Sequence, residues 1–250
     1  MFINIMLYSN CFIIHQVVQS SFLNCIYIYT HTHILAFSLC KMIVTYFYSV
    51  DHKGKIRITT GPQKYACDLT LDLNTAHTRL SMSERNRKVT HVREKQPYPD
   101  HPDRFDECRQ ILCKESLTGR CYWEVEWRYR ADISVTYKGI SRKGGSNDCL
   151  FGCNEKSWSL TWFNDRFSVS YNNKSTCTYA PSHRFNRIGV YLNWSAGTLS
   201  FYSVSDTHTL THLHTFNTTF TEPLYAGFRL YYSDSSVSLC EIKQLPVRNN

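Results

Sequence analysis

Three segments of the chain alternate apolar with polar residues: 121–127, 157–163 and 188–204. Side chains of an extended chain point alternately to opposite faces, so each segment predicts a β-strand with one apolar face. In the second segment Ser159, Thr161 and Phe163 share the opposite face, where we expect them to meet solvent or a partner. The third segment is interrupted by a turn-forming stretch at 195–197 and therefore predicts a β-hairpin.

Short apolar runs separated by turn residues continue through the rest of the chain. Turn signals recur at 118–119, 143–148, 172–173 and 233–235. No apolar pattern with a helical period follows Gly61, and 14% of the residues are aromatic, which suits side chains that pack on pleated sheets. The pattern predicts an all-β fold, a two-sheet antiparallel β-sandwich in a single large domain.

Residues 1–50 differ in composition, with one basic residue, Lys41, and no acidic residue. Polar residues interrupt every window long enough to span a membrane, and no basic residue precedes the apolar run as in a secretory signal. The repeat-like run at 26–33 favours a mispredicted exon, that is, a gene-model artefact, and a weak membrane or interfacial anchor is the alternative. Polar residues 51–64 are predicted to be a linker.

Several motifs resemble those of one family in amino-acid sequence and in order along the chain. WEVEW at 123–127, EKSWSL at 155–160 and LNW at 192–194 are similar to the SPRY core of PRY/SPRY domains. Residues 67–89 resemble the PRY segment, although Leu73 stands where the family usually has proline. The motif sequences are also similar to those of fish receptors of the NACHT and leucine-rich-repeat class and of fish tripartite-motif proteins. Several motifs in the right order are far more specific than any one of them.

The resemblance implies a curved two-sheet antiparallel β-sandwich at 65–245, with PRY at about 65–115 and SPRY at about 116–245. It also places three tryptophans of the strand motifs in the core: Trp123, Trp158 and Trp194.

Eleven cysteines raise the question of disulfides or metal sites. Their count is odd, the chain is long, and no spacing pairs them, so we expect buried free thiols. Three N-glycosylation sequons begin at Asn173, Asn193 and Asn217, and Asn193 falls inside a predicted strand. These observations favour a cytoplasmic protein.

The sequence contains no recognisable catalytic constellation. Three histidines, at 208, 212 and 214, share one segment without the acidic or thiol partners of a metal site, and no nucleophile, zinc-protease or phosphate-loop motif is present. We expect no enzymatic activity, no cofactor and no bound metal.

The net charge of +8 at pH 7 raises nucleic acid or an acidic surface as an alternative partner. Most basic residues are interleaved with acidic ones, as on a solvated surface. The clusters Arg128/Arg130 and Arg142/Lys143 remain as candidate anion contacts.

The resemblance implies a non-catalytic module that binds an unidentified protein through loops at one rim of the sandwich, in innate-immune sensing or ubiquitin-ligase targeting. A substrate-targeting fragment of a ligase whose catalytic part is missing is an alternative. By position, the binding face would comprise Asp132, Thr161, Phe163, Arg229, Tyr231 and Tyr232. Thr161 departs from relatives that have tryptophan there, so their ligands do not transfer.

Overall fold

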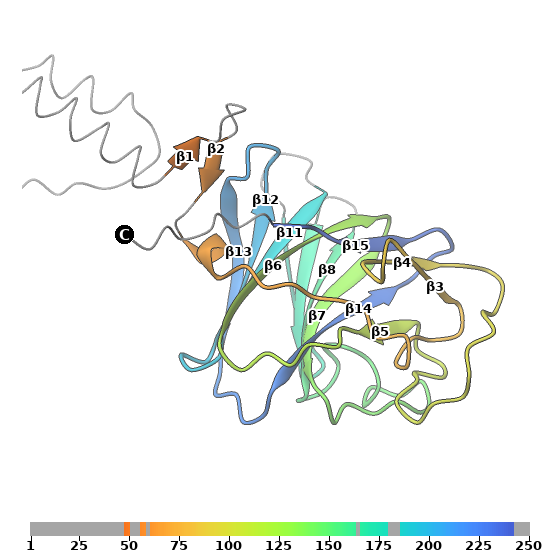
Figure 1. Cartoon of the computed structure of the whole chain (residues 1–250). Coiled ribbons are helices and arrows are strands. Elements are labelled where there is room, and N and C mark those ends of the chain that lie inside the picture. Colours follow the sequence, from red (N-terminus) through yellow and green to blue (C-terminus); the bar gives the residue numbers. More distant parts are fainter. Residues whose placement is uncertain (1–47, 51–55, 59–60, 164–165, 180–185, 243–250) are drawn as a thin grey trace, which may run out of the picture. The chain divides into compact units, whose positions relative to one another are not determined.

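The structure is a computed structural model that describes residues 48–50, 56–58, 61–163, 166–179 and 186–242 (Figure 1). The chain divides into two compact units, residues 1–59 and 60–250. In the first unit, β1 (Tyr48–Val50) pairs antiparallel with β2 (Ile56–Ile58). The interpretations of residues 1–47 lie outside the described residues.

The second unit is built from two antiparallel sheets. Its six-stranded sheet has the order β10 (Lys174–Tyr179), β9 (Arg166–Tyr171), β8 (Ser157–Phe163), β7 (Ala131–Tyr137), β14 (Leu224–Leu230) and β5 (Gln110–Leu112).

The seven-stranded sheet has the order β13 (Leu210–Asn217), β12 (Thr198–Val204), β11 (Arg187–Asn193), β6 (Arg120–Arg128), β15 (Ser236–Leu239), β4 (Lys88–His91) and β3 (Leu80–Ser83). A short 3-10 helix, η1 (Pro62–Tyr65), precedes it in the chain.

The core lies between the inner faces of the two sheets. Trp123 of β6 and Trp158 of β8 are each 2% exposed, and Val125 and Leu160 beside them are fully buried. The apolar side of each alternating segment therefore faces inward, because burying it against the other sheet removes it from water. The predicted all-β, two-sheet antiparallel sandwich is confirmed.

The outer face of the six-stranded sheet is partly covered by a second, smaller apolar cluster: Phe105, Cys108, Leu112, Ile140, Cys149 and Phe151. Ser159 lies under this covering at 1% exposure and shares a 2.9 Å hydrogen bond with Ser134. The expectation that Ser159 meets solvent or a partner is therefore wrong, because the loops folded over this sheet bury it.

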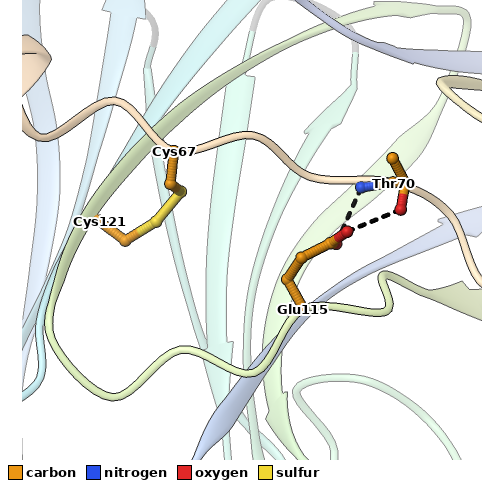
Figure 2. Close-up of a disulfide and its surroundings, with 4 residues drawn as sticks. All are labelled: Cys67, Thr70, Glu115 and Cys121. Carbon is orange, nitrogen blue, oxygen red and sulfur yellow. Dashed lines mark hydrogen bonds between the residues drawn. A yellow bond between two sulfur atoms is a disulfide. The ribbon is translucent and has the colours of Figure 1, made fainter.

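One disulfide joins Cys67 to Cys121, with 5.7 Å between their Cα atoms (Figure 2). Beside it, the backbone N–H of Cys67 donates to the carbonyl of Tyr122. Nearby, Glu115 accepts bonds from the hydroxyl and the N–H of Thr70, at 2.7 and 2.8 Å. The start of the PRY segment is thus fastened to the sandwich by a covalent bond and by hydrogen bonds.

The expectation of free thiols is wrong for this pair. The two cysteines are 54 residues apart, and only the folded sandwich brings them into bonding geometry. The other six cysteines in the described ranges are free: Cys108, Cys113, Cys149, Cys153, Cys177 and Cys240. Cys11, Cys25 and Cys40 lie outside those ranges.

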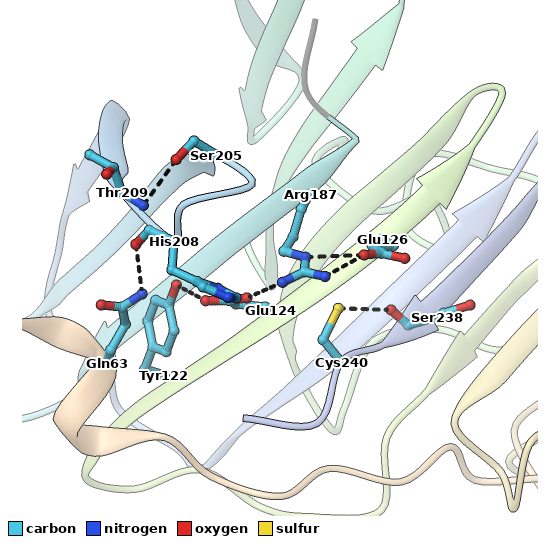
Figure 3. A network of polar contacts seen from close by, with 10 residues as sticks. All are labelled: Gln63, Tyr122, Glu124, Glu126, Arg187, Ser205, His208, Thr209, Ser238 and Cys240. Carbon is cyan, nitrogen blue, oxygen red and sulfur yellow. Dashed lines mark hydrogen bonds and ion pairs between the residues drawn. The ribbon is translucent and has the colours of Figure 1, made fainter. Parts of the chain in front are cut away.

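A polar network lies on the outer face of the seven-stranded sheet (Figure 3). Glu124 is 3% exposed and accepts a 2.8 Å hydrogen bond from the Tyr122 hydroxyl. Its carboxylate also forms an ion pair with Arg187 at 3.4 Å. Arg187 also pairs with Glu126 at 2.5 Å. Because each charge has an oppositely charged or hydrogen-bonding partner, the sheet tolerates a buried carboxylate here.

Candidate functional site

Two chain connections cross from one sheet to the other at the same end of the sandwich. The β6–β7 connection holds Tyr129 and Arg130, and the β14–β15 connection runs from Tyr231 to Ser235. They lie together because β6 pairs with β15 in one sheet and β7 pairs with β14 in the other. We call this end, with the adjoining ends of β7, β8 and β14, the rim.

Asp132 lies at the centre of the rim and is only 2% exposed. Its Oδ1 accepts a 2.5 Å hydrogen bond from the Thr161 hydroxyl, and its Oδ2 accepts one of 2.9 Å from the Tyr231 hydroxyl. Thr161 and Arg229 are its register partners on the two neighbouring strands.

Burial raises the pKa of the Asp132 carboxyl, because a charged carboxylate loses its hydration there. The Thr161 hydrogen bond and the charge of Arg229 act in the opposite direction. Together these contacts compensate for part of the cost of burying the carboxylate.

Tyr231 joins the buried aspartate to two arginines. The guanidinium carbon of Arg130 lies 3.9 Å from the centroid of the Tyr231 ring, and that of Arg229 lies 4.5 Å from it. Burial raises the pKa of the Tyr231 hydroxyl, and the negative charge of Asp132 adds to the effect. Cation–π contact and the hydrogen bond to Asp132 hold this half-buried ring in one orientation.

Exposed aromatic surface is concentrated at the rim. Among the described residues, the exposed large apolar side chains are Leu73 at 37%, Tyr129 at 56% and Tyr232 at 49%. The two tyrosines belong to the two crossing connections, and Tyr129 has a left-handed backbone with φ of 62°. Between the sheets at this end, the half-buried rings of Trp127 and Trp162 lie 6.1 Å apart. The rim thus presents aromatic groups on a rigid base.

The structure brings four of the sequence-predicted binding residues into one cluster: Asp132, Thr161, Arg229 and Tyr231. Tyr232 follows on the same connection. Phe163 ends β8 and pairs with Arg166, but its side chain lies outside the described residues. Asp132 and Thr161 differ from expectation in one respect. They hold the cluster together through hydrogen bonds beneath the surface, and Asp132 in particular is buried.

Tyr129 was not among the predicted binding residues, and Arg130 was predicted only as a candidate anion contact. The run Arg128-Tyr129-Arg130 follows a predicted strand directly, and a tyrosine between two arginines outside a strand was the available signal. Without the sheet pairing, nothing in the sequence relates this run to Tyr231.

The three predicted core tryptophans occupy different environments. Trp123 and Trp158 are each 2% exposed, and Trp158 stacks on Tyr171 with centroids 5.2 Å apart. Trp194 is only partly buried at the edge of the core, and its Nε1 donates a 3.0 Å hydrogen bond to the carbonyl of Glu222. Its strand ends there, so Trp194 covers the core's margin.

The two basic clusters also separate. Arg142 is 9% exposed, donates to the Lys138 carbonyl at 2.9 Å and lies over the Phe105 ring. Lys143 donates to the Arg104 carbonyl at 3.1 Å. Arg142 therefore packs within the fold, whereas the side chain of Lys143 is exposed, and an anion contact at this cluster stays a prediction.

Within the described ranges, no group of three His, Cys, Asp or Glu residues is arranged to hold a metal ion. His212, from the predicted histidine segment, instead contacts the Thr215 hydroxyl at 2.7 Å through Nε2.

No helix among the residues that the structure describes has the length and apolar character needed to cross a membrane.

Comparison with known families matches residues 69–117 to PRY, the SPRY-associated domain, and residues 120–242 to the SPRY domain. The chain belongs to the PRY/SPRY family. SPRY domains are protein-interaction modules, and the family is generally non-catalytic. The rim cluster of this PRY/SPRY domain therefore lies in a fold that binds proteins.

Relatives include stonustoxin subunit beta of Synanceia horrida, 44% identical over 66% of this chain and 24% of the toxin subunit. Tripartite motif-containing protein 16 of Mus musculus is 38% identical over 73% of this chain and 33% of that protein. The chain thus spans a quarter to a third of the length of these relatives.

Solved structures agree with the fold. The stonustoxin structure superposes with a TM-score of 0.66 at 42% identity, over 72% of this chain and 28% of that one. The TRIM65 PSpry domain has a TM-score of 0.65 at 26% identity, over 72% of this chain and 93% of that one.

Proposed function

We propose that this PRY/SPRY domain binds a protein partner at the rim, with Tyr129 and Tyr232 as anchors. The observation that carries the proposal is that two exposed tyrosines stand next in sequence to Arg130 and Tyr231, which contact each other, and that Arg229 also contacts Tyr231. Tyrosine and arginine are enriched among the residues that contribute most to binding energy. The sheet ends beneath them hold the side chains in position, which lowers the entropy lost on binding.

The test is capture of a partner by the immobilised full chain, followed by reconstitution with the purified partner. Tyr129→Ala and Tyr232→Ala are expected to weaken the measured affinity by about 30-fold each, the effect of losing a residue worth roughly 2 kcal/mol. Tyr191→Ala is the matched control, because Tyr191 is half-buried on the outer face of the seven-stranded sheet and stacks on Tyr65. Equal affinity for all three variants would refute the rim as the binding face.

Nucleic acid is the alternative to a protein partner, and the same capture experiment tests it. In the Arg128/Arg130 cluster both arginines contact tyrosines near the surface, and in the other cluster Arg142 is buried while Lys143 is exposed. Capture that nuclease abolishes would favour nucleic acid over protein.

The biological setting is proposed from the relatives. Two of them are tripartite motif-containing proteins, 16 and 14, of Mus musculus. We propose innate-immune sensing or ubiquitin-ligase targeting for the rim, with any ligase activity supplied by sequence outside this chain. Ubiquitination of the captured partner in cells, lost with Tyr232→Ala, tests the ligase role.

The cytoplasmic location stays a proposal. The Cys67–Cys121 disulfide counts against it, since such bonds persist mainly in oxidising compartments. Alkylation of the protein in intact cells, followed by mass spectrometry of the two cysteines, decides the question. Alkylated Cys67 and Cys121 would support the cytoplasm, and a linked peptide pair would overturn it.

A further inference from the structure

The rim carries more positive than negative charge. Three arginines belong to its two crossing connections and the strand ends beside them, Arg128, Arg130 and Arg229, and a fourth, Arg109, precedes β5 next to the end of β14. The acidic residues described on the same segments are Asp132 and Asp234. Arg109 lies beside the end of β14, because its backbone carbonyl accepts a 3.1 Å hydrogen bond from the N–H of Leu230.

The buried aspartate does not satisfy the arginine beside it. Both oxygens of Asp132 accept hydroxyl hydrogen bonds, from Thr161 and Tyr231. Within the described part of the chain, Arg229 forms neither an ion pair nor a side-chain hydrogen bond, although it is the register partner of Asp132. Its side chain contacts the face of Tyr231 instead.

A guanidinium stacked on an aromatic ring keeps its N–H donors in the plane of its own group. These donors form a rigid fork that fits the two oxygens of a carboxylate. Contact with the Tyr231 ring thus fixes the orientation of the Arg229 guanidinium, so that its N–H groups can donate to both oxygens of one acceptor. No described acceptor of this chain occupies that fork.

Two histidines near the rim have lowered pKa values, chiefly because they are buried and to a lesser extent because of nearby arginines. Burial, together with the charges of Arg109 and Arg79, lowers the pKa of His77 to about 4. Burial also lowers the pKa of His91, with Arg109 acting in the same direction. The Nε of Arg109 is itself buried, with no hydrogen-bond partner in the described chain. Burial disfavours a charge of either sign here, and it is the positive charge of the arginines that favours an anion over an added cation.

Resting on the proposed function, we infer that the partner binds through an acidic peptide segment. An Asp or Glu carboxylate of that segment pairs with the guanidinium of Arg229, and a neighbouring apolar side chain contacts Tyr232. Charge complementarity selects this occupant, because an acidic segment removes the unbalanced positive charge while a basic one adds to it.

The experiment pans a displayed library of random 12-residue peptides against the immobilised full chain. Enriched peptides are expected to carry an Asp or Glu next to an apolar residue. For a synthetic peptide of that kind, replacing the acid by its amide, Asp by Asn or Glu by Gln, is expected to weaken affinity about tenfold, as is Arg229→Gln in the protein. Affinity is expected to fall as NaCl rises from 50 to 500 mM.

Arg85→Gln is the matched control, because Arg85 is exposed in the β3–β4 turn and makes no ion pair with the described residues. Arg229→Lys keeps the charge and loses the fork, so partial retention of affinity is expected. A thermal melt of each variant shows that it is folded.

The outcomes distinguish the inference from the function on which it rests. Peptides that need Tyr232 but tolerate both the amide and Arg229→Gln would overturn the acidic partner and leave rim binding intact. An enriched set with no dependence on Tyr232, or no enriched set at all, would overturn both. Preference for a phosphoserine version of the peptide over the Asp version would replace the carboxylate by a phosphate as the bound anion and overturn the carboxylate assignment.

Discussion

The hydroxyl of Tyr231 donates a 2.9 Å hydrogen bond to Oδ2 of Asp132, although the two residues are 99 positions apart in the chain. This contact joins the end of the six-stranded sheet to the connection that leads into the other sheet. The ring of Tyr231 in turn contacts two arginines. A buried carboxylate thus sets the position of the surface groups that we assign to partner binding.

Replacing Asp132 by alanine is expected to destabilise the domain by about 1–3 kcal/mol, because it leaves the hydroxyls of Thr161 and Tyr231 without their acceptor. Asp132→Asn keeps the size and one acceptor oxygen and removes the buried charge, so a smaller loss is expected. Urea denaturation of both variants measures the difference. Equal stability of wild type and Asp132→Ala would contradict the supporting role.

Trp158→Ala is expected to cost about 3–5 kcal/mol, because it empties a core site. The indole packs against Tyr137, Tyr171 and Phe220, with centroids 5.2 to 5.4 Å away. The cooperative thermal transition of this variant should fall far below that of Tyr232→Ala, which changes a 49% exposed ring. Similar melting temperatures for the two variants would contradict the assignment of Trp158 to the core.

Arg187→Met is expected to destabilise the domain by roughly 3–5 kcal/mol, since among the described residues it leaves the buried carboxylate of Glu124 with the Tyr122 hydroxyl as its one side-chain partner. The double variant Arg187→Met with Glu124→Gln should recover much of the loss. Denaturant titrations of the two single variants and the double variant form a mutant cycle. Additive costs would show that the ion pair carries no coupling energy.

Reduction of the Cys67–Cys121 disulfide is expected to lower the free energy of unfolding by about 4 kcal/mol, the chain-entropy value for a loop of 54 residues. Cys67→Ser should reproduce the loss, and reducing agent should not lower the stability of that variant further. Differential scanning calorimetry with and without dithiothreitol makes the comparison. No shift in the wild type would show that the bond does not form in solution.

Acidification below pH 6.5 is expected to destabilise the domain through His77 and His91. Their pKa values are lowered by burial in the fold, to about 4 for His77, so the unfolded chain binds protons first as pH falls. The stability they contribute is complete above about pH 6.5 and is lost toward pH 4, at no more than about 1.4 kcal/mol per pH unit for each histidine. Urea titrations between pH 4.5 and 7.5 should show a flatter profile for His77→Gln. An unchanged profile would exclude His77 as the titrating group.

The strands of the SPRY part were predictable because their chemistry is local. The residues around Trp123 and Trp158 alternate between apolar and polar, so each strand has one apolar face. That face turns toward the core because its burial removes it from water. The motifs WEVEW and EKSWSL identified the family for the same reason, since strand-core residues are contiguous in sequence. The residues on β14 and beyond it that we propose for binding were located by position within that family pattern.

The sequence by itself determined the strand pattern and the family, and it located most of the residues that we propose for partner binding. Only the tertiary structure decided that Cys67 bonds to Cys121, that Asp132 is buried, and that Arg130 stacks on Tyr231. Each of these contacts joins residues 54 to 101 positions apart, or depends on loops closing over a sheet. Local alternation reports which face of a strand is buried, but the pairing of strands sets which distant side chains meet and how much water remains around them.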